Sequence, residues 1–169
     1  MGLLLAFLFG MAVTAFVSLA YSLLHRRKIE QRLYGIIHGS PIPTFVIRKD
    51  HIVVYWNGAL EKLSGIRAAS VLGTDQHWRA FYNAKRPCMA DLIVDDTLET
   101  VPNWYSGKYS KSKLLEKTYV ATDFFADLGE KGKWLRFTAA AIKDPSGSLY
   151  GAIETLEDIT EQKSAEEEL

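Results

Sequence analysis

The chain has 169 residues, of which 48% are hydrophobic and 24% charged, so it can form a packed core and is not a disordered tail. Its length allows one domain of ordinary size with an appendage. Twenty Lys and Arg balance twenty Asp and Glu. Because a chain without net positive charge lacks the general attraction to phosphate that nucleic-acid binders use, we expect no nucleic-acid partner.

The amino-terminal segment is uncharged over residues 2–24 and mostly apolar. As a helix these 23 residues would be roughly 35 Å long, enough to cross a hydrocarbon core of about 30 Å. Arg26, Arg27 and Lys28 follow directly, and positive charge on that side favours its retention in the cytoplasm. We therefore predict one transmembrane helix over 1–24, in a bacterial inner membrane, with the amino terminus outside and the remainder in the cytoplasm. The lipid bilayer is then a partner.

Small side chains recur at every fourth position of this segment. They are Gly2, Ala6, Gly10, Thr14, Ser18 and Ser22. Such a stripe lets two membrane helices approach closely, which indicates a homodimer, although small residues also align by chance in spanning helices.

An amphipathic stalk helix is predicted over 25–40, with apolar residues at helical spacing and an end at Gly39-Ser40-Pro41. Two strands then form a hairpin, over Pro43–Ile47 and His51–Trp56. Short helices are expected next. They cover Gly58–Ser64 with Asn57 as its cap, a piece ending at Val71-Leu72, Asp75–Tyr82 capped by Thr74, and Pro87–Val94.

Three further strands are predicted over Lys117–Phe125, Trp134–Ile142 and Leu149–Glu157. The last two are joined by Asp144-Pro145-Ser146-Gly147, a sequence typical of a type I turn. The segment Leu98–Tyr105 contains a proline and has no clear assignment, and a last helix starts at Glu161.

Trp56-Asn57-x-Ala59-x-Glu61-x-Leu63-x-Gly65 is followed by Val71-x-Gly73. This run resembles the second strand and first helix of PAS domains, the cytosolic sensor modules of many signalling proteins. Asp158-Ile159-Thr160 resembles the tripeptide that closes many PAS domains. The resemblance implies an α+β fold over 41–160, with a five-stranded antiparallel sheet and helices on one face. It also implies that a signalling helix leaves over 161–169 toward a downstream kinase, cyclase or chemotaxis-type output domain.

By this resemblance, a ligand would lie between the sheet and the middle helices. Trp78, Phe81 and Tyr82 share one helical face and are candidates for a pocket wall, although such a stripe more often belongs to plain core. His77 is a candidate haem ligand, and otherwise a residue on the helix surface or in a cap. Cys88 lacks the flanking sequence of flavin-binding light sensors, which favours a buried apolar role.

The cofactor is therefore left open, since neither haem nor flavin is supported by a specific motif. Four histidines and one cysteine show no HxxxH or CxxC spacing, so no metal site is predicted.

The remaining motif residues are expected to be structural. They are Trp56, Asn57, Glu61, Asp158 and Thr160. We expect Glu61 in a salt bridge, and Asp158 with Thr160 in local hydrogen bonds that fix the exit of the last helix. Asp123 and Glu154 fall on predicted strands and are candidates for a pair of carboxylates, although paired acidic residues on strands more often face solvent.

No catalytic motif is present: there is no Gly-x-Ser-x-Gly elbow and no phosphate-binding glycine loop, so no catalytic residue is predicted. The sequence leaves three functions open. They are a PAS sensor that binds a small molecule, a PAS module that dimerises and relays a signal without a ligand, and a membrane-tethered α+β enzyme.

Overall fold

The computed structural model describes residues 2–105, 107–111 and 118–168, apart from the side chains at 3–10, 12, 13, 15, 30, 33, 34, 37, 98 and 167. Two compact units make up the chain, residues Met1–Gly39 and Ser40–Leu169. The predicted first residue of one strand, Lys117, and the last residue of the final helix, Leu169, lie outside the described residues.

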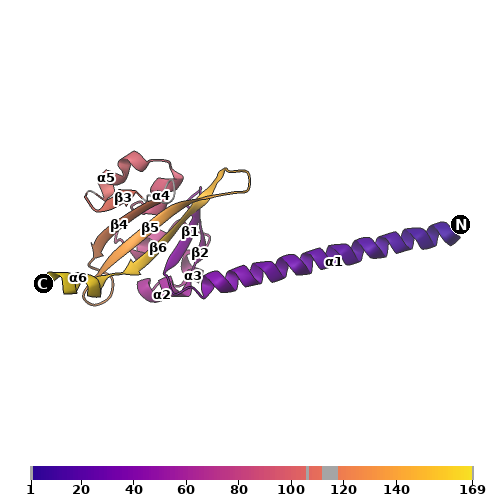
Figure 1. Cartoon of the computed structure of the whole chain (residues 1–169), viewed down its shortest axis with the longest axis horizontal. Helices are drawn as coiled ribbons and strands as arrows, with labels where there is room; N and C mark the ends of the chain where they lie inside the picture. Colours follow the sequence, from indigo (N-terminus) through magenta and orange to yellow (C-terminus); the bar gives the residue numbers. More distant parts are fainter. Residues whose placement is uncertain (1, 106, 112–117, 169) are drawn as a thin grey trace. The chain divides into compact units, whose positions relative to one another are not determined.

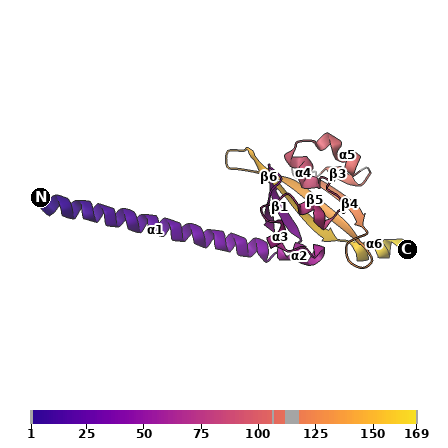
Figure 2. The same cartoon turned by 180° about the vertical axis from the view of Figure 1, so that it is seen from behind.

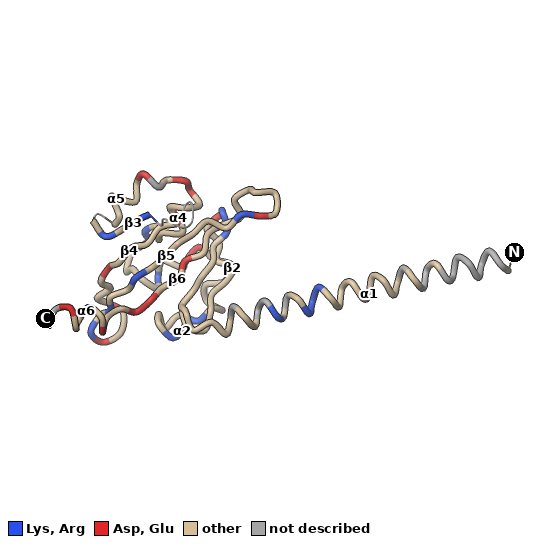
Figure 3. Tube along the Cα trace, viewed as in Figure 1, with Lys and Arg blue, Asp and Glu red and all other residues tan. Residues whose placement is uncertain are grey.

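The first unit is one helix, α1, over Gly2–His38 (Figure 1). It ends at the predicted place, where the Gly39 amide donates to the Gly35 carbonyl at 2.9 Å. In Figure 3, Lys and Arg gather in the carboxyl-terminal half of α1. Within the part of the chain that the structure describes, no helix combines the length and apolarity that a bilayer crossing requires.

The second unit contains a six-stranded antiparallel sheet in the order β2-β1-β6-β5-β4-β3. Its strands are β1 Thr44–Arg48, β2 Val53–Trp56, β3 Tyr109–Lys111, β4 Thr118–Phe125, β5 Lys133–Lys143 and β6 Leu149–Asp158. The predicted hairpin is confirmed, because β1 and β2 pair with Phe45 opposite Trp56. The three later strands are confirmed as well. In their connecting turn the Gly147 amide donates to the Asp144 carbonyl at 2.9 Å.

The prediction of five strands is wrong by one. The additional strand, β3, pairs with β4 at the sheet edge, with Tyr109 opposite Ala121. Its three residues are Tyr-Ser-Lys. A strand this short and polar shows no alternation of apolar and polar side chains from which it could be predicted.

The helices of this unit are short. They are α2 Gly58–Ser64, α3 Ala68–Val71, η1 His77–Ala80, α4 Met89–Val94, η2 Leu98–Thr100, α5 Val101–Trp104 and α6 Thr160–Glu167. Asn57 caps α2, because its side chain accepts from the Leu60 amide at 2.9 Å. The helix predicted over Asp75–Tyr82 is only the 3₁₀ turn η1. The side chain of Thr74 accepts from the Gln76 amide at 3.2 Å, so the turn starts late.

Helix α4 positions the candidate site. It packs against β1, β5 and β6 of the sheet (Figures 1 and 2), and every one of its residues is buried. The strands contribute apolar side chains to the same core, including Phe45, Leu135, Phe137 and Leu156, each at most 2% exposed. This packing fixes the amino-terminal end of α4 close to the β1–β2 hairpin.

Candidate functional site

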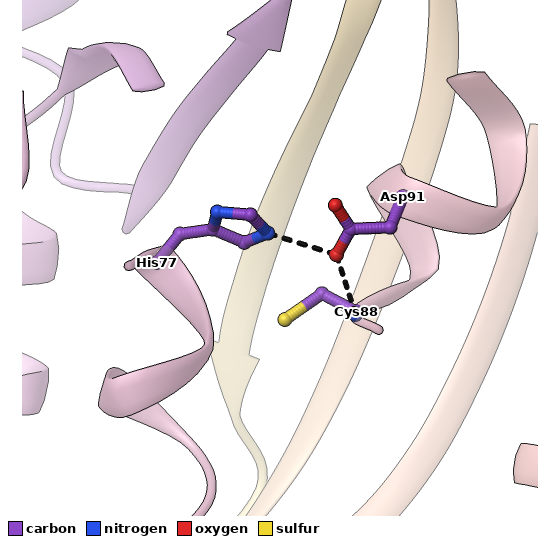
Figure 4. A group of neighbouring side chains, drawn as sticks. All are labelled: His77, Cys88 and Asp91. Atoms are coloured by element: carbon purple, nitrogen blue, oxygen red, sulfur yellow. Dashed lines mark hydrogen bonds and ion pairs between the residues drawn. The ribbon is translucent and has the colours of Figure 1, made fainter. Parts of the chain in front are cut away.

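A buried carboxylate on α4 joins three separate segments of the chain. Asp91 is 6% exposed, and its Oδ1 lies 2.7 Å from Nδ1 of His51 while its Oδ2 lies 2.8 Å from Nε2 of His77. The Cys88 amide donates to the same Oδ2 at 2.7 Å (Figure 4). We call His51, His77, Cys88 and Asp91 the Asp91 cluster.

Local structure explains why these four residues meet. Asp91 is the third residue of α4, and its carboxylate reaches back to the amide of the capping residue Cys88, which satisfies a free backbone donor of the first turn. His51 lies in the β1–β2 turn with a positive φ of 66°, a conformation that non-glycine residues seldom adopt. Its other ring nitrogen, Nε2, lies 3.0 Å from Oδ1 of Asp95, beyond the end of α4. The hairpin is thereby linked to both ends of α4.

The groups of the cluster perturb one another's protonation. Burial lowers the pKa of His51, but its contacts with Asp91 and Asp95 outweigh burial and raise it overall. Burial opposes ionisation of Asp91, yet hydrogen bonds from His77, His51 and the Cys88 amide hold its pKa below the usual value. Burial, with Glu154 and Asp91 nearby, raises the pKa of the Cys88 thiol well above its usual value. The cluster therefore holds an ionised carboxylate beside a protonated thiol at neutral pH.

A cavity of about 540 Å³ opens beside the cluster. Its lining includes His51, His77 and Asp91 of the cluster and carboxylates at Asp50, Asp75 and Asp95. Asp75 pairs with Lys85 at 2.5 Å, and Trp78 supplies an aromatic surface. Most of the described lining residues are charged or titratable, so the cavity suits a polar small ligand.

Arg86 forms another part of the cavity wall. Its guanidinium carbon lies 4.1 Å from the ring centroid of Tyr82, 5.1 Å from that of Trp104 and 5.5 Å from that of Tyr105. Three electron-rich ring faces stabilise a cation without neutralising it. Among the described residues, its buried Nε and Nη2 atoms have no hydrogen-bond partner.

Glu154 lies on β6, under α4, which separates it from solvent. It is 3% exposed, and its carboxyl group accepts from the Ala90 amide at 2.8 Å. Burial, reinforced by Asp91, raises its pKa to about 8. The expectation that Glu154 faces solvent is wrong, because β6 is a central strand covered by α4. Asp123, on β4, instead pairs with Lys108 at 2.5 Å near the sheet edge.

The three candidate wall residues have different surroundings. Trp78 is half-buried and lines the cavity. Phe81 lies in the core, with its ring centroid 6.1 Å from that of Phe45 and 6.0 Å from that of Phe125. The hydroxyl of Tyr82 lies 3.2 Å from that of Tyr105.

The residues considered for haem and flavin are both buried. His77 is 2% exposed, so its placement on a helix surface is wrong. Its Nε2 faces Asp91 and its ring stacks on Phe45 with centroids 5.4 Å apart, and its role as a haem ligand stays a prediction. The buried placement of Cys88 is confirmed at 1% exposure, and the described cavity lining does not include it.

The motif residues form hydrogen bonds that connect neighbouring elements of the domain. The Trp56 indole donates to the Ile66 carbonyl at 3.2 Å, and Asn57 is fully buried. The described partner of Glu61 is the Ala68 amide at 2.6 Å rather than the expected cation, so Glu61 connects α2 to α3. The predicted local bonds of Asp158 are confirmed, since its Oδ1 accepts from the Thr160 amide at 3.1 Å and hydroxyl at 2.5 Å.

Sequence reasoning missed the centre of the site. His51 and Asp91 are 40 positions apart, and no spacing rule connects them. The one local signal was an Asp three residues after Cys88 at the start of a predicted helix, a typical position for a side chain that caps the helix.

Comparison with known proteins gives a family model described as PAS fold, which matches residues 31–78. No curated protein sequence matches this chain.

Among solved structures, the PAS domain of BvgS from Bordetella pertussis aligns with a TM-score of 0.52 and 19% identity, over 82% of this chain and 91% of that one. A PAS domain from Colwellia psychrerythraea aligns with a TM-score of 0.50 and 16% identity, over 79% and 98%. The phage VqmA–DPO complex aligns with a TM-score of 0.50 and 17% identity, over 85% of this chain but only 58% of the VqmA chain. At these identities the likeness shows the fold alone.

Proposed function

The second unit of the chain has a PAS fold, and from this premise we propose that it is a sensor module of a signalling protein. A small ligand enters the cavity, engages the Asp91 cluster and changes the link between the β1–β2 hairpin and α4. The observation that carries this proposal is the contact of one buried carboxylate with two histidines from different elements at a cavity wall. A ligand that competes for those contacts binds more tightly when they are open than when they are formed. This difference in affinity is what a shift between two conformations requires.

A continuous set of contacts supports transmission from the cavity to the end of the domain. The Ala90 amide in α4 donates to Glu154 of β6, and β6 continues to Asp158. There Lys133 pairs with Asp158, and the Trp134 amide donates to the Thr160 hydroxyl at 3.0 Å at the start of α6. A shift of α4 can therefore change how α6 leaves the sheet.

The packed aromatic core favours a second candidate function, a relay that needs no ligand. Phe81, Phe125 and Phe137 fill the space between the sheet and the short helices, with ring centroids about 6 Å apart. In this alternative the signal enters through residues 25–40 and passes along β1 to β6, which pair over five positions. An enzyme is the least supported function, because none of the described clusters has a nucleophile, a base and an oxyanion site in the required order.

We also propose that residues 2–24 attach the chain to a bacterial inner membrane with the PAS unit in the cytoplasm. The 23 uncharged residues and the basic residues after them support this placement. A homodimer and a downstream output domain of kinase, cyclase or chemotaxis type complete the proposal. The even balance of charge over the whole chain argues against nucleic acid as a direct partner.

Hydrogen–deuterium exchange on the full chain tests the sensor proposal. Asp91→Asn weakens the contacts with His51 and His77, so we expect faster exchange in the β1–β2 turn and also in α6. Asp75→Asn is the matched control, because Asp75 lines the same cavity but pairs with exposed Lys85. Faster exchange confined to the β1–β2 turn and α4, with α6 unchanged, would contradict transmission to the carboxyl-terminal helix.

A further inference from the structure

We propose that the Asp91 cluster binds a divalent transition-metal ion of the zinc type through His77, Cys88 and Asp91. One ligand atom from each of these residues lies within 4.8 Å of the other two, and the residues are 2%, 1% and 6% exposed. This inference rests on the proposed function, because it names the ligand class of the same cavity.

The donor atoms select the kind of ion. An imidazole nitrogen, a sulfur and a carboxylate oxygen are the three ligand types that zinc uses in proteins, whereas calcium and magnesium take oxygen ligands. The sulfur therefore favours a softer ion such as Zn²⁺. Three protein ligands leave one coordination position of a tetrahedral ion for water or another molecule, which is typical of sites that exchange ligands rather than of closed structural sites.

The distances require only small movements. Zinc bonds of about 2.0–2.3 Å at tetrahedral angles place neighbouring ligand atoms roughly 3.3–3.6 Å apart. The present separation of 2.8 Å between Nε2 of His77 and Oδ2 of Asp91 would thus widen by roughly half an ångström. In Figure 4 the carboxylate of Asp91 faces the His77 ring, and the thiol of Cys88 lies beside them on the His77 side of the Cys88 backbone. The three ligand atoms now lie within 4.8 Å of one another, so the sulfur has to approach the other two by at most about 1.5 Å to complete the set.

The surrounding contacts orient the ligands, as is usual around bound metals. His51 holds the second carboxylate oxygen of Asp91 at 2.7 Å, and Asp95 in turn lies 3.0 Å from the far nitrogen of His51. Nδ1 of His77 is buried and, within the described ranges, has no hydrogen-bond partner. That nitrogen can accept the proton that the ion displaces from Nε2.

The proton balance follows from these groups. The ion replaces the thiol proton of Cys88, which leaves to solvent, while His77 moves its proton from Nε2 to Nδ1. Asp91 binds as the carboxylate it already is. Metal binding at neutral pH therefore releases one proton per ion, because metal ligands must be deprotonated.

A cobalt titration of the full chain, stripped with a chelator, tests the inference. Co²⁺ takes the place of zinc and gives a thiolate-to-metal charge-transfer band when sulfur is a ligand. We expect one Co²⁺ per chain, with displacement by Zn²⁺ and release of one proton measured with a pH indicator. Cys88→Ala should remove the band, and Asp91→Asn should weaken Zn²⁺ binding at least tenfold. Asp123→Asn, which changes a carboxylate that pairs with Lys108 outside the described cavity lining, should leave affinity unchanged.

His51→Gln separates a ligand from a supporting residue. His51 contacts Asp91 but is not in the ligand set, so its loss should keep the band and weaken binding by about 10–100-fold. Circular dichroism shows which variants remain folded. Cys88→Ala is the decisive one, since it removes a single buried atom.

Three results would overturn the metal site. They are a substoichiometric metal content, a charge-transfer band that persists in Cys88→Ala, or a loss of affinity in Asp123→Asn equal to that in Asp91→Asn. Native mass spectrometry then distinguishes the two proposals. An organic molecule bound without metal overturns the metal site and leaves the sensor proposal standing. Zinc binding that leaves hydrogen exchange in α6 unchanged supports the site and contradicts the sensor proposal.

Discussion

The carboxyl group of Glu154 is a buried acid whose pKa is raised to about 8 by burial. Its ordinary value is 4.5, so between these values the folded protein holds a proton that the unfolded chain releases. The folded state is then favoured at low pH, and this advantage is lost as pH rises toward the folded pKa. The slope is at most about 1.4 kcal/mol per pH unit.

Glu154→Gln removes the titrating group and keeps an acceptor for the Ala90 amide. We expect the free energy of unfolding of the wild type, relative to that of this variant, to fall by about 2–4 kcal/mol from pH 5 to pH 8. Urea unfolding with chelator present measures it. Cys88, Tyr82 and Tyr105 lie nearby, but burial raises the pKa of each further above this range. A pH-independent difference between the two proteins would show that Glu154 does not titrate there.

Asn57 also acts through a single buried side chain. Its Oδ1 accepts from the Thr44 amide at 3.0 Å and the Leu60 amide at 2.9 Å, and its Nδ2 donates to the Ile42 carbonyl at 2.7 Å. Asn57→Ala leaves these groups without partners, so we expect a loss of about 2–4 kcal/mol in the free energy of unfolding. Asn83→Ala, which removes an exposed hydrogen bond to Asp127, should cost less than about 0.5 kcal/mol. Equal losses in the two variants would contradict a stabilising role for the buried hydrogen bonds of Asn57.

At the level of elements, β1 and β6 approach so closely that one position tolerates only glycine. A Cβ on Gly151 would lie 2.0 Å from the Ile47 carbonyl oxygen and 3.0 Å from the Arg48 Cα. Because both are backbone atoms, the strands would have to separate. Gly151→Ala should cost more than about 3 kcal/mol or prevent folding. Gly58→Ala, in open space at the start of α2, should change stability by less than about 1 kcal/mol. Urea unfolding compares the two, and a mild effect at Gly151 would contradict the close approach.

Elements with strong local signals could be predicted from the sequence. Gly58–Ser64 has the cap Asn57 before it and Gly65, at φ 72°, after it, and the helix has the predicted bounds. The later strands are eight or more residues long, and in β5 buried apolar residues recur at alternate positions, at Leu135, Phe137 and Ala139. Elements that depend on partners far away in the sequence could not be predicted in this way. The short edge strand β3 exists only because β4 lies beside it.

The site could be predicted only in part, for the same reason. Trp78 lines the cavity, as its place in the aromatic stripe predicted. For His51 the sequence predicted only a position in the first hairpin. Its contact with Asp91 depends on how the hairpin turn meets α4, and therefore on the packing of the whole sheet. The burial of Glu154 likewise follows from the central position of β6, which a strand pattern alone does not reveal.

For the whole molecule, the division into two units has a direct consequence for stability. The residues of the described core, from Phe45 to Ile159, all belong to the second unit. We therefore expect residues 40–169 alone to unfold cooperatively, at a urea midpoint close to that of the same unit in the full chain. Circular dichroism measures both. A molten or unfolded fragment would show that α1 contributes to the core.

If the proposed membrane attachment holds, self-association is the property that the first unit should add. Close packing at small residues is what membrane helices use to associate, because lipid gives them no hydrophobic reason to do so. If the stripe of Gly2, Ala6, Gly10, Thr14, Ser18 and Ser22 is the contact, Gly10→Ile forces the two backbones apart. A loss of about 1–2 kcal/mol corresponds to a dimer roughly 5–30-fold weaker. Energy transfer between labelled chains in vesicles measures the change. Leu24→Ile, at a position outside the stripe, is the control and should leave the dimer intact. Equal dimerisation of all three chains would place the contact elsewhere, on the PAS unit or its terminal helix.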